Sequence, residues 1–191
     1  GKGLGGSSAI NAMVYIRGHR SDYDQWAALG NAGWSFTDVL PYFKRAENNA
    51  DFDGEYHGKG GPLAVNKLRT QNPVQQTFLQ AAQEAQFRLR EDFNADDHEG
   101  LGVYQVTQKN GERWSAARAY IHPHMGSRAD LRVETGAHAT RILFEGKRAV
   151  GVEYRQGKEV KQIRARREVI VSSGAFQTPQ LLMLSGVGNS K

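Results

Sequence analysis

The chain has 191 residues, which is enough for one domain, or for one domain and part of another. It contains no cysteine, which excludes disulfides, thiolate metal sites and a cysteine nucleophile. The formal net charge is +5, yet the densest basic run, residues 158–167, alternates with other residue types like a solvated strand and has no interleaved aromatic residues. No apolar run approaches the ~20 residues of a membrane span, so we expect no transmembrane segment and a cytoplasmic protein.

The first fifty residues predict a glycine-rich loop followed by three helices. Four of the first six residues are glycine, which is typical of a loop whose backbone N–H groups approach an anionic or electron-rich ligand. Residues 8–17 then predict a helix that ends at Gly18. Ser21 is the predicted N-cap of a second helix through Leu29, and Ser35 or Thr37 that of a third.

The middle of the chain predicts a polar loop, two helices and a strand. Residues 47–61 are rich in glycine, asparagine and aspartate, which indicates a surface loop. Pro73 stands where a helix over 74–86 would begin. The remaining predicted elements are a strand over 103–108, a turn at Asn110-Gly111, and a short helix over 116–121 that Ser115 caps and Pro123 ends.

The last third predicts a β-meander and a short helix. Alternating, β-branched segments predict strands over 131–133, 139–144, 149–154, 160–165 and 168–171. Gly146 and Gly157 lie in the predicted turns. Residues 179–184 predict a helix that stops at Ser185-Gly186.

The opening also matches the pattern G-x-G-x-x-G through Gly1, Gly3 and Gly6. We reject a dinucleotide-binding turn here, because that turn needs a preceding strand and the sequence shows none. The acidic residue expected about twenty positions further on is also missing, since Asp22 and Asp24 belong to the predicted second helix. A phosphate-binding loop is excluded because Gly-Lys-Ser/Thr never occurs.

The six histidines predict neither a metal centre nor a catalytic triad. His122 and His124 flank Pro123, which disfavours a regular geometry that would direct both at one metal, so we expect both at the surface. We expect His57 and His98 to be solvated as well. The G-x-S-x-G motif of a serine hydrolase is absent from the sequence.

Two long segments at opposite ends of the chain resemble signatures of a known protein family. Residues 1–11, GKGLGGSSAIN, strongly resemble the first signature of the glucose–methanol–choline (GMC) oxidoreductases, a family of FAD enzymes. Residues 174–188, GAFQTPQLLMLSGVG, are similar to its second signature. Between them, YHG…GPL from Tyr56 and GERWSAA from Gly111 also resemble stretches of that family, in the same order.

The resemblance implies a mixed α/β fold of the FAD/NAD(P)-binding type that contains a β-meander and part of a substrate domain. Residues 1–50 would supply the flavin-facing loop and helices, 51–125 a partial substrate-binding region, and 126–191 the meander and the adenine side. The N-terminal Rossmann βαβ unit and the C-terminal half, which carries the catalytic histidine pair of the family, are expected outside this sequence. We therefore expect an internal fragment that has no catalytic residue and is inactive by itself.

The resemblance also implies which residues contact FAD. The glycine loop near the flavin and pyrophosphate would contribute Gly5, Gly6 and Ser7. The segment that lines the isoalloxazine ring, largely through backbone groups, would consist of Asn11, Ala12, Met13 and Val14. On the adenine side the resemblance implies a backbone contact at Ala139 and a wall at Gly174. Some relatives attach FAD covalently through a histidine where this chain has Ile10, so we expect noncovalent FAD.

The expected activity is oxidation of a primary alcohol to an aldehyde by hydride transfer to flavin N5. Choline-like, aliphatic and aromatic alcohols all fit this expectation, as do dehydrogenase and oxidase chemistry. The complete protein could associate peripherally with a membrane. Two alternatives stay open at this point: a non-catalytic binding module that has kept a flavin-type loop, and a basic nucleic-acid-binding domain.

Overall fold

The computed structural model describes residues 2–70 and 72–189. The chain divides into two compact units, residues 1–131 and 132–191. Gly1, the first glycine of the G-x-G-x-x-G match, lies outside the described residues. The division into three functional regions stays a prediction.

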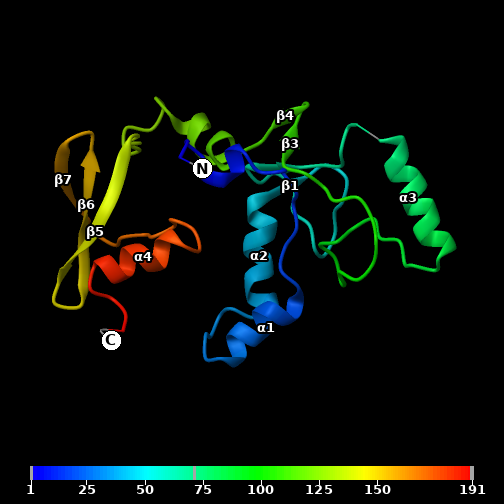
Figure 1. Cartoon of the computed structure of the whole chain (residues 1–191), viewed down its shortest axis with the longest axis horizontal. Helices are drawn as coiled ribbons and strands as arrows, with labels where there is room; N and C mark the ends of the chain where they lie inside the picture. The colour runs from blue at the N-terminus through cyan, green and yellow to red at the C-terminus, as the bar shows by residue number, and fades with distance from the viewer. Residues whose placement is uncertain (1, 71, 190–191) are drawn as a thin grey trace. The chain divides into compact units, whose positions relative to one another are not determined.

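Two helices of the first unit begin where the sequence carries capping signals, and a third begins before its predicted cap, Ser21. Helix α1 (Arg20–Ala28) and helix α2 (Phe36–Ala46) pack against each other, and the Tyr23 ring of α1 lies 5.7 Å from the Phe43 ring of α2. Helix α3 (Pro73–Glu84) has proline at its first position, and its N-cap is the side chain of Asn72. In Figure 1, α3 stands apart from α1 and α2, on the other side of the short strands.

Short strands and turns complete the first unit. Strands β1 (Glu47–Asn49) and β2 (Leu63–Val65) pair in parallel. Strands β3 (Gln108–Lys109) and β4 (Glu112–Arg113) form a hairpin, whose turn residues Asn110 and Gly111 have φ values of 54° and 83°. A π-helical turn, η2 (Ala117–Ile121), and a 3₁₀ turn, η3 (His122–His124), follow. The predicted hairpin turn is confirmed, because both of its residues have the positive φ that such turns require.

The second unit is an antiparallel meander with one helix. Strands β5 (Ala137–Glu145), β6 (Arg148–Gln156) and β7 (Glu159–Arg164) pair in chain order. Helix α4 (Gln177–Leu184) lies beside β5 (Figure 1), where the Ser185 hydroxyl oxygen accepts the backbone N–H of Ile142 at 2.8 Å. The three central strands of the predicted meander and the short helix are therefore confirmed.

The predicted helix over 8–17 is wrong. A 3₁₀ turn, η1 (Gly6–Ala9), is followed by irregular backbone as far as α1, with a left-handed residue at Met13 and a single bridge at Val14. The Asn11 side chain bonds to the backbone two residues further on, which competes with helical hydrogen bonding. Val14 bridges Val106 in an antiparallel contact, so this β-branched stretch finds a strand partner instead.

Three predicted strands are absent or shortened. Residues 131–133 and 168–171 form no ladder, and residues 103–108 contribute only two isolated bridges, both at Val106, and the start of β3. A β-branched segment becomes a strand only where another backbone segment lies alongside it. The two end segments of the predicted meander have no such partner among the described residues.

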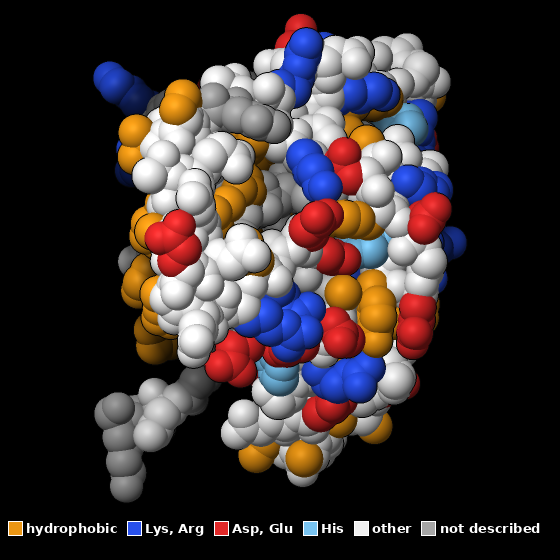
Figure 2. Space-filling model, turned by 90° about the vertical axis from the view of Figure 1, so that its right-hand side faces the viewer, with side chains coloured by type: hydrophobic (Ala, Val, Ile, Leu, Met, Phe, Trp, Pro, Cys, Tyr) orange, Lys and Arg blue, Asp and Glu red, His pale blue; other side chains and the backbone are white. Residues whose placement is uncertain are grey.

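The face of the first unit around α3 carries charges of both signs. Figure 2 shows Lys and Arg interspersed with Asp and Glu over this face. Arg88 pairs with Asp97 and Arg90 with Asp96, each at 3.1 Å. Such a mixture is typical of a solvated protein surface. Within residues 2–70 and 72–189, no helix is long and apolar enough to cross a membrane.

Candidate functional site

The predicted flavin-facing residues of the first unit lie on one continuous segment, residues 5–14. Gly5 and Gly6 have φ values of 91° and 59°, a conformation that side chains disfavour. A Cβ atom added at Gly5 would lie 3.1 Å from the Ala117 Cβ, which is tight packing, whereas one at Gly6 would meet open space. Ser7 is exposed within η1, and its carbonyl oxygen accepts the backbone N–H of Asn11 at 2.8 Å. The loop is therefore compact on one side and open on the other.

A strained turn follows at Met13, which is not a glycine and yet has a φ of 64°. The Asn11 side-chain oxygen accepts the Met13 backbone N–H at 3.0 Å, and the Met13 carbonyl accepts the Thr107 N–H at 2.8 Å. Val14 then bridges Val106. Two polar contacts and a strand partner thus hold a backbone conformation that costs free energy.

The outer side of this segment offers hydrogen-bond donors beside apolar surface. The backbone N–H groups of Ala12 and Val14 donate to no other described residue. Ile10 and Val14 are 73% and 43% exposed, and Ala12 is also exposed. Free backbone donors next to exposed apolar side chains suit a flat apolar ring with acceptor atoms along one edge. The segment therefore fits the isoalloxazine ring that the resemblance implies.

Arg113, from outside the segment, and Ser8, within it, make further contacts here, and the sequence predicted a role for neither. One terminal nitrogen of Arg113 donates to the Asn11 carbonyl at 2.7 Å and to the Asn11 side-chain oxygen at 3.0 Å. The Ser8 hydroxyl donates to the Gly5 carbonyl and accepts the Ala116 backbone N–H, the latter at 2.9 Å. The signal that could have found Arg113 is its place two residues after the Asn110-Gly111 hairpin turn.

The other two predicted FAD contacts belong to the second unit. Ala139 is exposed on β5, opposite Tyr154 of β6 and next to an irregularity in the strand register. Gly174 is exposed ahead of α4, with a φ of 91°, and its carbonyl oxygen accepts the Thr178 N–H at 3.0 Å. Their contacts with the adenine moiety stay predictions.

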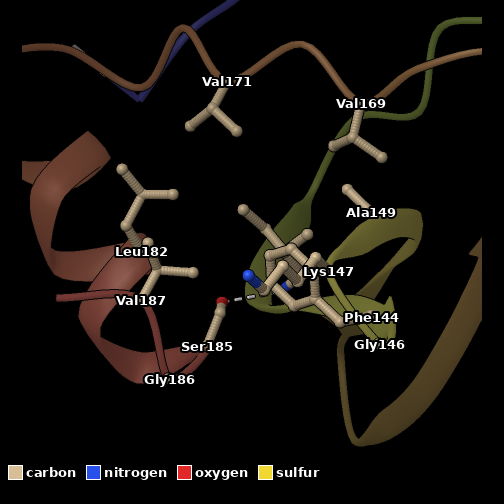
Figure 3. A pocket seen from close by; sticks show the side chains of 11 residues that line it. Phe144, Gly146, Lys147, Ala149, Val169, Val171, Leu182, Ser185, Gly186 and Val187 are labelled. Carbon is tan, nitrogen blue, oxygen red and sulfur yellow. Dashed lines mark hydrogen bonds between the residues drawn. The ribbon is translucent and has the colours of Figure 1, made fainter.

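The second unit has a mostly apolar pocket of about 620 Å³ between β5, residues 169–171 and α4. Figure 3 shows Val171 and Leu182 facing this space from two sides. The Ser185 hydroxyl oxygen, which accepts the Ile142 backbone N–H, lies below them in the view. Neither Ala139 nor Gly174 lines it. The pocket is thus separate from the two predicted adenine contacts.

The prediction of a surface loop over residues 47–61 holds for residues 50–55, but it is wrong for residues 47–49, and the predicted solvation of His57 is wrong. Glu47 begins β1 and is fully buried, and His57 is 5% exposed. The His57 Nε2 atom lies 2.7 Å from an Asp92 carboxylate oxygen, and its Nδ1 atom lies 3.1 Å from a Glu47 oxygen. Arg17, also buried, donates to the other Glu47 oxygen at 2.8 Å. These residues are polar, yet they are buried, because their charged groups pair with one another inside the unit.

The pairing shifts the acidities of these groups. Burial acts to lower the pKa of His57, but the hydrogen bonds with Asp92 and Glu47 outweigh it and raise the pKa to about 9. Burial likewise acts to raise the pKa of Glu47 and of Asp92, yet their hydrogen bonds with His57 hold both below the usual range. His57 is therefore a buried cation between two carboxylates at neutral pH.

The remaining histidines of interest lie apart from this cluster. His122 and His124 are exposed, as predicted. His98 is half-buried rather than solvated, and its ring meets that of His19 edge-on at 5.3 Å between centroids. Burial lowers the pKa of His98. No group of three potential metal ligands occurs in the part of the chain that the structure describes.

The sequence has curated relatives among alcohol-oxidising enzymes. It is 51% identical to an alcohol dehydrogenase (acceptor) of Pseudomonas putida, over 98% of this chain and 34% of that protein. It is 48% identical to an oxygen-dependent choline dehydrogenase of Brucella anthropi, again over 98% of this chain and 34% of the relative. The chain therefore spans about a third of the length of these relatives.

The structure and a family model agree with these matches. The fold is similar to that of an FAD-dependent oxidoreductase from Chaetomium thermophilum, with a TM-score of 0.87 and 31% identity over 95% of this chain and 34% of that one. The family model described as GMC oxidoreductase matches residues 1–191. Since that match covers the whole sequence, this chain belongs to the GMC oxidoreductase family.

Proposed function

We propose that this chain is the flavin-facing part of an FAD-dependent enzyme that oxidises a primary alcohol to an aldehyde. The observation that carries the proposal is the exposed segment 10–14, with its unpaired backbone donors at Ala12 and Val14 beside apolar surface. The family membership supports the same conclusion.

Within this function, the chain binds and orients the cofactor. The open side of the loop at Gly6 would let the backbone approach the phosphate end closely, because a Cβ there would occupy that space. The N–H groups of Ala12 and Val14 would donate to acceptor atoms along the ring edge, and the exposed Ile10 and Val14 side chains would cover apolar ring surface. Bound FAD would supply the hydride-accepting chemistry, whose electronics such backbone donors tune.

We assign no general base to this chain. His57 is buried, and both of its ring nitrogens are engaged by carboxylates, so it cannot reach a substrate hydroxyl. His122 and His124 are exposed on η3 and have no carboxylate partner among the described residues. We expect the base of the complete enzyme to come from residues outside this sequence, as the family resemblance implies.

The finer parts of the proposal concern the cofactor bond, the substrate and the location. Ile10 offers no nucleophilic side chain for a covalent flavin link, so we propose noncovalent FAD. The substrate class is a small primary alcohol, choline-like, aliphatic or aromatic. We propose a cytoplasmic location, with peripheral membrane association of the complete protein as the alternative.

The test is the visible absorbance spectrum of the purified complete protein that carries this sequence. We expect flavin bands, their bleaching when a primary alcohol is added without oxygen, and release of the flavin into the supernatant on acid precipitation. A protein without flavin bands, even after incubation with FAD, would contradict the proposal. Flavin that stays with the precipitate would contradict only its noncovalent part.

A further inference from the structure

Arg113 occupies a central place beside the exposed segment, although it lies about a hundred residues away in the sequence. Its side chain extends from the end of β4 and is half-buried. One terminal nitrogen lies 2.7 Å from the Asn11 carbonyl oxygen, 3.0 Å from the Asn11 side-chain oxygen and 3.3 Å from the Ser8 carbonyl oxygen. A single cationic group thus joins three acceptors of the loop.

The contact with Asn11 also determines the turn that follows. The Asn11 side-chain oxygen accepts both the Arg113 guanidinium and the Met13 backbone N–H. The Met13 φ of 64° is disfavoured for a residue with a side chain, so this turn persists only with outside support. Arg113 holds the amide in the orientation that supplies this support.

Arg113 can do this because the hairpin that carries it is firmly built. The type of turn at Asn110 and Gly111 matches the twist of a two-stranded hairpin. The Trp114 backbone N–H donates to the Thr107 carbonyl at 2.9 Å, and its indole N–H donates to the Pro62 carbonyl at 2.8 Å. Thr107 in turn donates to the Met13 carbonyl at 2.8 Å. Arg113 and Thr107, at the base of the hairpin, therefore hydrogen-bond to the segment at Asn11 and Met13.

We propose that Arg113 is a positioning residue for the flavin, because it fixes Asn11 and the turn at Met13 and thereby aims the free N–H groups of Ala12 and Val14. This inference rests on the proposed function. Arg113 acts through Asn11 rather than on the ring itself, so we do not place it among the groups that touch the cofactor.

The experiment compares Arg113→Ala and Arg113→Lys with Arg118→Ala in the complete, FAD-loaded protein. Arg118 is the matched control, because it is an exposed arginine that pairs with Glu112 of the same hairpin and lies over the Trp114 ring, but forms no hydrogen bond or ion pair with residues 5–14. Three readouts are needed: the FAD dissociation constant, the visible circular dichroism of the bound flavin, and amide hydrogen exchange of a peptide spanning Met13 in the FAD-free protein.

We expect Arg113→Ala to weaken FAD binding about tenfold or more, because hydrogen bonds to a charged group are lost. Its flavin dichroism should change, and exchange at Met13 should accelerate. Arg113→Lys should give an intermediate effect, since an ammonium is a point charge without the guanidinium's fixed fork. Added guanidinium ion should partly restore FAD binding to Arg113→Ala, whereas Arg118→Ala should match the unmodified protein.

Unchanged FAD affinity and unchanged dichroism in both Arg113 variants would overturn the inference while leaving the proposed function intact. Unchanged exchange at Met13 would overturn it as well, because the turn would then not depend on Arg113. If Arg113→Ala fails to fold, the same three readouts on Arg113→Lys test the inference instead. If the unmodified protein binds no flavin, the proposed function fails, and exchange at Met13 still reports whether Arg113 holds the turn.

Discussion

At the scale of single residues, the most unusual feature is the buried charge cluster of Arg17, Glu47, His57 and Asp92. Removing charges from water is costly, so such a cluster persists only when every member is paired. The pairing here is nearly complete, because the Asn49 amide donates to Glu47 and the Tyr56 carbonyl oxygen accepts from the Arg17 guanidinium, of which only Nε has no partner among the described residues. Arg17 lies three residues after Val14, so the cluster also fixes the end of the flavin-facing segment.

The cluster predicts how stability depends on pH. The folded protein binds the His57 proton more tightly than the unfolded chain, because the pKa of His57 is raised from 6.5 to about 9. The resulting stabilisation is fully present below pH 6.5 and is lost as the pH rises through about 9. The lowered pKa values of Glu47 and Asp92 act oppositely, since their stabilisation is present above the ordinary values of 4.5 and 3.8 and is lost in acid.

Urea unfolding of the unmodified protein and of His57→Gln, followed from about pH 5 to about pH 10, measures the His57 contribution. The free-energy difference between the two proteins should be largest near pH 6 and should shrink through pH 9. A difference that stays constant over this range would show that His57 is not a cation in the folded protein.

The turn at Met13 predicts an inverted glycine effect. Met13→Gly should be more stable than Met13→Ala by about 1 kcal/mol, because only glycine adopts a positive φ without a steric cost. Ala12→Gly is the control, and it should destabilise the protein by roughly 0.5–1 kcal/mol, since Ala12 has no positive φ. Chemical denaturation measures all three. An alanine at position 13 that equals or exceeds glycine in stability would refute the strained turn.

At the scale of elements, local sequence signals predicted where most of the helices begin. They failed where contacts with residues far along the chain determine the conformation. Ser35 and Pro73 begin helices as the sequence predicts, because a capping hydroxyl and an N-terminal proline act on their own turn. The true cap of α1 is His19, whose ring nitrogen accepts the Ser21 N–H at 3.2 Å, and histidine is not a usual capping residue. Ser21 therefore lies inside α1.

This difference between the two serines is testable. Ser35→Ala should lower the free energy of unfolding by about 1 kcal/mol, because the Asp38 backbone N–H loses its side-chain acceptor. Ser21→Ala should change it by less than about 0.5 kcal/mol, since alanine suits a helix interior and the exposed Ser21 hydroxyl bonds only to the His19 ring. Thermal or chemical unfolding of the two variants gives the comparison. An equal loss of unfolding free energy in the two variants would contradict this account, because Ser21 would then cap α1.

The misread segments share one physical cause. Residues 8–17 contain apolar residues at helical spacing, but their hydrogen-bond partners, at 105–107 and Arg113, lie far along the chain. From the sequence, the polar residues around Glu47 and His57 look solvated, because their partners Arg17 and Asp92 lie elsewhere in the chain. Periodicity carries no information about such partners, so the elements of the meander and most helices were predictable, whereas the conformation of the site and its buried charges were not.

At the scale of the whole molecule, the two units carry the two groups of predicted FAD contacts. The first unit holds the segment 5–14, and the second holds Ala139 and Gly174. The resemblance to the GMC family predicted both groups, because a family resemblance carries a binding mode that no single residue reveals. The second unit also leaves a large apolar pocket open on β5.

The most direct measurement is an experimental structure of the complete protein with FAD bound. We predict that the isoalloxazine ring lies within about 4 Å of residues 11–14, with the Ala12 or Val14 N–H directed at its edge and Arg113 still on Asn11. A flavin bound elsewhere, with residues 11–14 turned away from it, would contradict the account.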